Sequence, residues 1–364
     1  MAKITLENIS HTYDPPSVPE DRKTYAVSDL SISWEDGSSN ALLGPSGCGK
    51  TTILNIISGL QQPSQGKVLI DGRDVTRDSP GKRRIAQVFQ FPVVYDSMNV
   101  FDNLAFPLRN QGMPEEDVRR KVTEIAKVLD LEDYLSNPPA KLNAAEKQKI
   151  SLGRGIVRED TTAVLLDEPL TVIDPKLKGN MRRKLKEVQK NLQKTMIYVT
   201  HDQHEALTFA DDVTIVKDGR LVQKGSPEEL HSQPATPFIG YFIGSPGMNI
   251  LDCTHRDNTL EFKTFSLNIS QELASRLHNT GNSFQLGIRP EFIQVYLAAG
   301  ENTVPFQVQV VENTGAYWIV TYIRESIRIK ARVPESIPVA DGQEHYLFFP
   351  EDRINIFHHE QRVV

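Results

Sequence analysis

The sequence lacks long hydrophobic runs, is poor in cysteine and carries no excess of positive charge. No apolar stretch approaches the roughly 20 residues that a membrane-spanning helix needs, so we do not expect the chain to cross a bilayer. Its two cysteines, Cys48 and Cys253, provide no disulfide framework. The start of the chain lacks the basic segment and apolar core of a secretory signal. These absences predict a protein of the reducing cytoplasm.

Net charge and chain length further limit the partners and the number of domains that we expect. Lys and Arg total 41 against 47 Asp and Glu, a net charge of −6, which gives no overall attraction to nucleic acid. We therefore expect no nucleic-acid partner. A length of 364 residues exceeds what one compact core usually holds, so the chain is predicted to have two domains.

Strand-like and helix-like stretches alternate up to about residue 235, a pattern typical of an α/β domain with a largely parallel sheet. Three short apolar runs, each followed by polar residues, are predicted to be buried strands: 40–43, 163–166 and 196–199. The segment from about 91 to 160 has helical periodicity, with Val118 and Val122 on one face. It is predicted to be a helical subdomain inserted into a first domain that spans residues 1–240.

A short span rich in turn residues marks the end of this domain. Residues 234–247 contain three prolines and three glycines, and helical periodicity is absent beyond them. Strand-like runs at 307–311, 318–322 and 327–330 predict a second, all-β domain over residues 248–364.

The first motif with clear chemistry is a glycine-rich loop that follows the strand 40–43 and precedes a predicted helix. It has the eight-residue spacing of a phosphate-binding loop and consists of Gly44, Pro45, Ser46, Gly47, Cys48, Gly49, Lys50 and Thr51, followed by Thr52. Its glycines let backbone N–H groups converge on a phosphate, Lys50 adds a positive charge and the Thr51 hydroxyl is a ligand for Mg²⁺. The loop therefore predicts ATP and Mg²⁺ as cofactors. Cys48 either fills the loop as a small side chain or is a thiol activated at a helix start.

Two adjacent carboxylates follow the second predicted strand. Asp167 would hold Mg²⁺ through its water shell, and Glu168 can orient and polarise the water that attacks the γ-phosphate. Without other motifs, an Asp-Glu pair after a strand is as typical of a solvated helix cap as of a catalytic site. Downstream of a phosphate loop, it indicates catalysis.

Two further residues take their meaning from their order along the chain. His201 directly follows the third predicted strand and can reach the γ-phosphate as a donor, although a single histidine is more often structural. Gln90 opens the helical subdomain, and its amide can touch both Mg²⁺ and the attacking water. The order phosphate loop, Gln90, Asp167 with Glu168, Asp174 and His201 predicts that these residues form one site.

In this order the motifs resemble those of the ATP-binding-cassette ATPases over the whole chain, and specifically those of the carbohydrate importers of the maltose and glycerol-3-phosphate class. The matching segments are the phosphate loop, 88–90 (Q-loop), 165–169 (Walker B), 171–174 (D-loop), 198–205 (His-switch), and 245–249 with 287–291 in the second domain. The resemblance implies a P-loop ATPase domain followed by a β-rich regulatory domain of the OB or TOBE type. It also implies a dimer in which each ATP lies between one chain's phosphate loop and the other chain's signature helix.

The same resemblance implies partners and a location. Two such ATPases drive two transmembrane permease subunits at the cytoplasmic face of the bacterial inner membrane, and a periplasmic solute-binding protein takes part indirectly. Tyr13 stands where these ATPases stack an aromatic ring on adenine, and Tyr25, displaced by the insertion 14–23, is its rival.

One segment departs from the family. The family signature is Leu-Ser-Gly-Gly-Gln, whereas this sequence has Leu142, Asn143, Ala144, Ala145 and Glu146 before a helix. By resemblance, the last four of these residues would face the partner's ATP. The carboxylate of Glu146, about 6 Å from a γ-phosphate, would repel it by roughly 3 kcal/mol per unit charge at an effective dielectric of about 20. The helix dipole offers only about 0.3–1 kcal/mol in return, so repulsion wins unless Glu146 turns back into a capping box with Asn143.

This departure has two explanations. One is neutral drift with function kept. The hypothesis we favour is pairing with a second ATPase whose signature is intact, which gives one competent and one degenerate ATP site. Together with Phe91 and Pro92 after the glutamine, the departure resembles the second ATPase of bacterial glycerol importers, so glycerol is the expected cargo.

Three other functions stay open at this level. A homodimeric ATPase of a sugar or glycerol-3-phosphate importer would share every nucleotide-binding residue. A soluble cassette ATPase acting on nucleic acid or ribosomes would do so too, since a small β-domain can bind nucleic acid. A regulatory pseudo-ATPase would explain the altered signature, but the intact Glu168 and His201 argue against it.

Overall fold

The structure is a computed structural model that describes residues 2–158, 160–278 and 280–364. These residues form two compact units, one ending at Pro227 and the other running from Glu228 to Val364. Within the described ranges, no helix has both the length and the apolar character that crossing a membrane requires.

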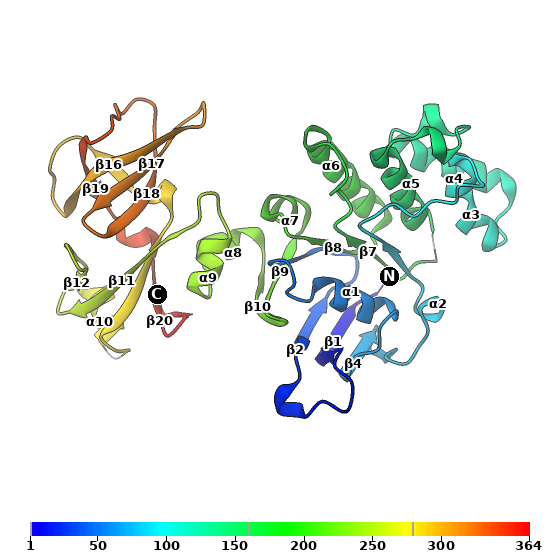
Figure 1. The fold of residues 1–364 in the computed structure, drawn as a ribbon, viewed down its shortest axis with the longest axis horizontal. Helices are drawn as coiled ribbons and strands as arrows, with labels where there is room; N and C mark the ends of the chain where they lie inside the picture. Colours follow the sequence, from blue (N-terminus) through cyan, green and yellow to red (C-terminus); the bar gives the residue numbers. More distant parts are fainter. Residues whose placement is uncertain (1, 159, 279) are drawn as a thin grey trace. The chain divides into compact units, whose positions relative to one another are not determined.

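The first unit is built on a six-stranded sheet with the strand order β10-β9-β3-β8-β7-β6 (Figure 1). The five strands from β9 to β6 are parallel, and β10 runs antiparallel to β9. The strands are β3 (Ser39–Leu43), β6 (Ile85–Val88), β7 (Ala163–Asp167), β8 (Thr195–Thr200), β9 (Asp212–Lys217) and β10 (Arg220–Gly225). Every residue of β3, β7 and β8 is buried, as expected for apolar runs covered on both faces of a parallel sheet. The three predicted strands are confirmed and lie side by side.

A second, antiparallel sheet with the order β2-β1-β4-β5 packs with the first. Its strands are β1 (Ile4–Thr12), β2 (Tyr25–Trp34), β4 (Gln65–Ile70) and β5 (Arg73–Asp74). One hydrophobic cluster joins both sheets to helix α1 (Lys50–Ser58). Its members include Ile4, Trp34, Leu42, Ile53 and Leu165. The start of α1 is thereby held at the end of β3.

The chain between β6 and β7 is helical, as predicted. Helices α3 (Val100–Asn110), α4 (Glu115–Val128) and α5 (Ala144–Ile156) pack against one another beside the sheet (Figure 1). Val118 and Val122 are fully buried in this insert. The other helices of the unit are α2 (Pro80–Arg83), α6 (Pro175–Leu192) and α7 (Gln203–Phe209), with 3-10 turns at Glu20–Arg22, Glu132–Tyr134 and Pro139–Lys141.

The second unit contains two antiparallel sheets, with the orders β13-β12-β11-β14-β20-β21 and β15-β19-β16-β17-β18. The first sheet comprises β11 (Asn249–Arg256), β12 (Thr259–Glu261), β13 (Ser266–Asn268), β14 (Ser283–Ile288), β20 (Ile354–His358) and β21 (Gln361–Arg362). The second comprises β15 (Gln294–Tyr296), β16 (Thr303–Asn313), β17 (Trp318–Arg324), β18 (Ile327–Val333) and β19 (Glu344–Phe348). Their inner faces share one hydrophobic core. The predicted strands within 307–330 correspond to β16, β17 and β18.

Two features of this unit were not anticipated. Helix α10 (Gln271–His278) interrupts what was expected to be an all-β domain, alongside 3-10 turns at Pro290–Phe292 and Glu351–Arg353. The two units also divide at Pro227, ahead of the boundary expected between 240 and 248. The reason is Arg289, whose buried guanidinium donates to the carbonyls of His231 and Ile243. It ties α8 (Pro227–Ser232) and α9 (Pro237–Phe242) to the β-rich unit.

Candidate functional site

The phosphate loop connects β3 to α1 in a conformation that requires glycine. A Cβ on Gly44 would lie 2.2 Å from the carbonyl oxygen of Val216. At Gly49 the backbone has φ +96°, and a Cβ there would lie 2.2 Å from the carbonyl oxygen of Ala26. Since Gly49 is also the N-cap of α1 and offers no side-chain cap, the first N–H groups of this helix point toward the loop with no side chain bound to them.

Lys50 and Cys48 fill the space behind the loop. The Lys50 ammonium donates to the carbonyls of Gly44 and Pro45, at 2.8 Å each. The Cys48 thiol is buried, and burial raises its pKa despite the charge of Lys50 nearby. A raised pKa disfavours the thiolate that nucleophilic chemistry needs, so Cys48 fits the role of a space-filling side chain.

Asp167, the last residue of β7, faces the phosphate loop. Burial raises the pKa of its carboxyl, a hydrogen bond from Thr51 opposes that rise, and the adjacent Glu168 charge adds to it. Asp167 and Thr51 therefore present oxygen atoms together, which is the donor chemistry that Mg²⁺ prefers. Among the described residues, no group of three or more His, Cys, Asp and Glu side chains is arranged to hold a metal by itself. A Mg²⁺ ion here would need phosphate and water oxygens as further ligands.

Glu168 follows in a strained conformation. Its backbone has φ +45°, a left-handed value that costs a residue with a side chain on the order of 1 kcal/mol or more. Its N–H donates to the carbonyl of Val199 on the neighbouring strand β8, at 2.9 Å. This turn directs the carboxylate across the end of the sheet instead of along β7.

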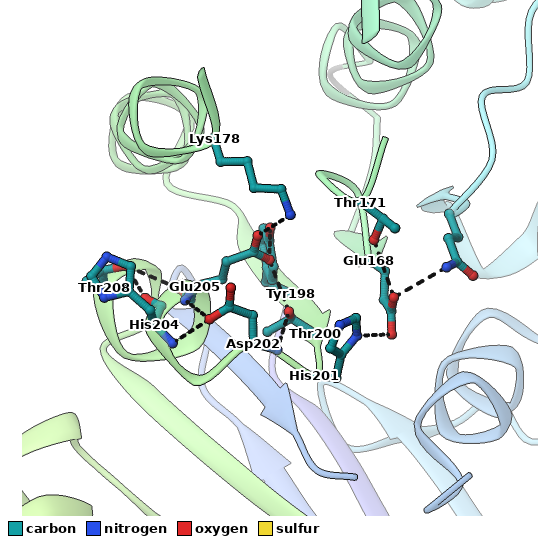
Figure 2. A network of polar contacts seen from close by, with 11 residues as sticks. Glu168, Thr171, Lys178, Tyr198, Thr200, His201, Asp202, His204, Glu205 and Thr208 are labelled. Carbon is teal, nitrogen blue, oxygen red and sulfur yellow. Dashed lines mark hydrogen bonds and ion pairs between the residues drawn. The ribbon is translucent and has the colours of Figure 1, made fainter. Parts of the chain in front are cut away.

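The carboxylate of Glu168 is the meeting point of the predicted catalytic residues. Its Oε1 accepts from Nδ1 of His201, at 2.9 Å, and its Oε2 accepts from Nε2 of Gln90, at 3.3 Å. The hydroxyl of Thr171 donates to Oε2 as well, also at 3.3 Å (Figure 2). Because Nδ1 carries the hydrogen that Glu168 accepts, the other ring nitrogen of the half-exposed His201 is free to face a substrate.

Gln90 lies in a segment that is fixed to the signature helix α5. The side-chain amide of Gln148 donates to the carbonyl of Phe89, at 3.1 Å. Ser151 accepts from the N–H of Val93, at 3.2 Å, and Arg154 donates to the carbonyl of Val93, at 2.7 Å. The three contacts lie three residues apart on α5, and so on one face of that helix.

The two candidate adenine-stacking tyrosines differ in their surroundings. Tyr13 is 65% exposed, and its hydroxyl is 3.1 Å from that of Thr52 on α1, beside the phosphate loop. Tyr25 instead donates to the carboxylate of Glu20 in the insertion. The ring of Tyr13 packs edge-on against His11 but is largely exposed next to the loop, so Tyr13 is the better candidate.

The altered signature forms the start of α5 and is closed by a complete capping box. The side chain of Asn143 accepts from the N–H of Glu146, and Glu146 accepts from the N–H of Asn143, at 2.9 Å each. The Tyr134 phenol lies beside the same carboxylate, and this charge, together with a hydrogen bond to Glu146, raises the pKa of Tyr134. Glu146 thus does turn back into the cap, the case in which the predicted repulsion of a phosphate is reduced. The contact with Tyr134 had no signal in the sequence.

Comparison with known proteins was informative along the whole chain. The ABC transporter family matches residues 27–171, and the MalK OB fold domain matches residues 244–293. The chain is 39% identical over 348 residues to the trehalose/maltose import ATP-binding protein MalK of Thermococcus litoralis, covering 91% of this chain and 93% of that protein. It is 39% identical over 303 residues to the sn-glycerol-3-phosphate import ATP-binding protein UgpC of Vibrio cholerae, covering 82% and 80%. The oligosaccharides import ATP-binding protein MsmX of Bacillus subtilis is 34% identical over 370 residues, covering 100% and 99%.

Solved structures give the same picture for the first unit. The dimeric ATP-binding cassette MJ0796 in a post-hydrolysis state with ADP and phosphate superimposes with a TM-score of 0.55 at 26% identity, covering 62% of this chain and 98% of that one. The protein cbiO1 of Clostridium perfringens, part of an ABC transporter complex, gives a TM-score of 0.56 at 27% identity, covering 63% and 90%. With a phosphate loop, an Asp-Glu pair and a histidine at the ends of neighbouring strands, the chain belongs to the ATP-binding subunits of ABC transporters, in the group of import ATPases that carries a MalK-type OB domain.

Proposed function

We propose that this chain hydrolyses Mg²⁺-bound ATP at the ends of β3, β6, β7 and β8 as the motor subunit of a carbohydrate or polyol importer. The observation that carries the proposal is the carboxylate of Glu168, which contacts Gln90 and His201 at once. The three residues come from distant parts of the sequence, and a merely solvated carboxylate would not bring them together.

In the proposed mechanism each residue has a distinct task. Lys50 and the open N-terminus of α1 bind the phosphates, and Tyr13 stacks on the adenine. Thr51, Asp167 and Gln90 would hold Mg²⁺, which supplies charge neutralisation on the phosphates. Glu168 accepts a hydrogen bond from the attacking water and polarises it. His201, as an imidazolium with a hydrogen on both ring nitrogens, donates one to Glu168 and the other to the γ-phosphate. The strained backbone of Glu168 aims the carboxylate at that water.

Glu168→Gln tests the central role. The amide keeps the size of the side chain but removes its charge, so we expect ATP to remain bound while turnover in the assembled transporter falls by at least about 100-fold. Glu187→Gln, an exposed glutamate on α6, is the matched control and should leave turnover unchanged. Undiminished hydrolysis in Glu168→Gln would refute the assigned role.

The altered signature, which puts the carboxylate of Glu146 at the start of α5, supports pairing with a second ATPase whose signature is intact. In this chain the N–H groups of Asn143 and Glu146 are already occupied by side chains, so they are not available to a partner's phosphate. We propose that ATP on this chain is completed by the partner's signature, and that the partner's ATP meets the degenerate one. Two permease subunits and a periplasmic solute-binding protein would complete the importer at the cytoplasmic face of a bacterial inner membrane.

Purification from solubilised membranes tests this assembly. Expression with its operon neighbours should yield a complex that contains one copy each of two different ATPases. A stable and fully active complex that contains this ATPase alone would contradict the heterodimer and favour the homodimeric importer.

For the cargo we propose a small polyol or sugar, with glycerol first. The relatives named above import trehalose, maltose, sn-glycerol-3-phosphate and oligosaccharides, and glycerol rests on the altered signature with Phe91 and Pro92. Stimulation of ATP hydrolysis by each candidate solute in the reconstituted transporter, with its binding protein present, decides among them. Stimulation by a disaccharide but not by glycerol would exclude the glycerol assignment.

A further inference from the structure

A second carboxylate lies behind the proposed catalytic site. Glu205, at the start of α7, is only 4% exposed. Its Oε2 accepts from the phenol of Tyr198 and from the hydroxyl of Thr200, at 3.0 Å each, and its Oε1 accepts from the ammonium of Lys178, at 3.2 Å (Figure 2). A buried charge is strongly unfavourable unless it is paired and hydrogen-bonded. Three donors meet that requirement, so the geometry of Glu205 is well defined.

This network fixes both neighbours of His201. Thr200 is the last residue of β8, and its hydroxyl accepts from the N–H of Asp202, at 3.0 Å, while it donates to Glu205. Asp202 in turn caps α7 by accepting from the N–H of His204, at 2.8 Å. The backbone on each side of His201 is therefore held by side-chain oxygens, while the imidazole itself extends toward Glu168 (Figure 2).

Glu168 and Glu205 connect the same two chain segments at different depths. Glu168 joins His201 to Thr171, which lies just before the N-cap of α6. Glu205 joins Thr200 to Lys178, in the first turn of that helix. Since both carboxylates span from the end of β8 to the start of α6, a displacement at Glu205 changes the distance that the less buried Glu168 must bridge.

We propose that Glu205 is a positioning residue for ATP hydrolysis, acting through Thr200 to hold His201 against Glu168. The inference rests on the proposed role of His201. None of the network's hydrogen bonds and ion pairs among the described residues reaches the phosphate loop or Tyr13, so loss of positioning lowers kcat and leaves ATP affinity unchanged. A residue that only stabilised the fold would instead lower the folded fraction, or activity and affinity together.

The pair Thr200→Val and Thr200→Ser isolates the hydroxyl. Valine has the same shape but cannot donate to Glu205 or accept from Asp202, whereas serine keeps both contacts. We expect Thr200→Val to lower kcat about 10-fold or more in the assembled transporter at saturating ATP, since small misplacements of a catalytic group are costly. The Kd for ATP of the full chain should change less than about twofold. Thr200→Ser should keep kcat within about twofold of that of the unaltered protein.

Glu205→Gln and a matched control complete the test. Glu205→Gln should lower kcat to a similar extent, and the double variant with Thr200→Val should be no worse than either single one, because both act through one contact. Lys186→Met is the control: it removes another ion pair of α6, that between Lys186 and Asp211 at 3.0 Å, and should leave kcat unchanged. Where Glu205→Gln does not fold, the Thr200 pair decides alone.

The outcomes separate this inference from the function on which it rests. If His201→Ala keeps full hydrolysis, the proposed role of His201 fails and the positioning role fails with it. If His201→Ala abolishes hydrolysis but Thr200→Val stays within twofold of the unaltered protein, only the positioning role is overturned. Equal impairment in Thr200→Val and Thr200→Ser, or a parallel loss of ATP binding, overturns it as well.

Discussion

Two helix N-termini in the first unit have opposite designs. Helix α1 begins at Gly49, which has no side chain to cap it and a backbone that admits no other residue without a clash. Helix α5 begins at Asn143 and closes its own first turn through a reciprocal capping box with Glu146. An uncapped N-terminus leaves its N–H groups and its positive dipole end for a phosphate. In α5 the N–H of Glu146 is already used and a carboxylate lies at the N-terminus. The starts of the two helices, which the family uses together to bind one ATP, therefore differ in what they can bind.

Lys50→Ala changes the uncapped N-terminus of α1 and should have the largest effect of the changes considered, on ATP binding. The loop loses the only positive side chain among its residues 44–51, and hydrogen bonds to charged groups are worth up to about 3 kcal/mol each. We expect the Kd for ATP to rise by roughly 100-fold, measured by equilibrium dialysis. Lys190→Ala, at an exposed position near the end of α6, is the control and should bind normally. Retained affinity in Lys50→Ala would mean that ATP binds elsewhere.

Alanine at the two caps compares the helices directly. Gly49→Ala places a methyl 2.2 Å from the carbonyl oxygen of Ala26 at φ +96°, and we expect the free energy of unfolding to fall by roughly 2 kcal/mol or more. Asn143→Ala only loses the side-chain cap and should lower it by about 1 kcal/mol. Urea unfolding of the full chain measures both. A larger loss for Asn143→Ala would contradict the view that α1 is the more constrained end.

Restoring the family's signature tests whether the altered residues at the start of α5 disable the second ATP site. The combined changes Asn143→Ser, Ala144→Gly, Ala145→Gly and Glu146→Gln restore the family's signature. Serine at 143 and glutamine at 146 still form a capping box, so this variant removes the charge of Glu146 and the methyl groups of Ala144 and Ala145 but not the cap. If the altered signature is what disables the site, hydrolysis by the purified chain alone should rise at least about 10-fold, a barrier change of about 1.4 kcal/mol.

Glu146→Gln alone serves as the control for charge. Glutamine also forms a capping box, so this variant removes the negative charge but keeps the N-terminus closed. A full gain of activity in Glu146→Gln would show that the charge of Glu146 is the obstacle, whereas a gain in the fourfold variant alone would assign it to residues 143–145. No gain in the fourfold variant would leave the degenerate site without support.

The smallest expected effect is on the pH dependence of stability, through the carboxyl group of Asp167. Burial raises the pKa of Asp167. A carboxyl with a raised folded-state pKa contributes stability that is full below its unfolded pKa, about 3.9, and is lost as pH rises through the folded value. Asp167→Asn should therefore raise the urea midpoint at about pH 7, and this gain should vanish toward about pH 4. Asp36→Asn, an exposed aspartate, is the control. A gain independent of pH would contradict this cause.

Much of the site could be predicted because its signals are local. The strand, loop and helix around Lys50 form one continuous motif. The apolar runs before Glu168 and His201 have the length of strands and end in polar residues, as expected of buried strands. The order of motifs also predicted that Gln90 would join them, and its 3.3 Å contact with Glu168 agrees.

The rest depends on contacts between distant segments. Glu205 and Lys178 lie 27 residues apart on different helices, and neither is unusual in its own stretch of sequence. Helix α10 has only eight residues, with Leu273, Ala274 and Leu277 buried, too short a pattern to show helical periodicity. The domain boundary was expected at the turn-rich span, but Arg289 binds that span to the later unit.

Three hydrogen bonds tie α5 to residues 89 and 93, on either side of Gln90, so a movement of the helical insert is transmitted to Gln90. Helix α5 has 13 residues and is about 20 Å long at roughly 1.5 Å per residue. A tilt of about 10° would move its far end by roughly 3.5 Å, by the same geometry. That displacement is as large as the 3.3 Å contact between Gln90 and Glu168. A modest rotation of the insert is thus enough to disengage the glutamine, so the orientation of the helices and the state of the catalytic carboxylate are mechanically coupled.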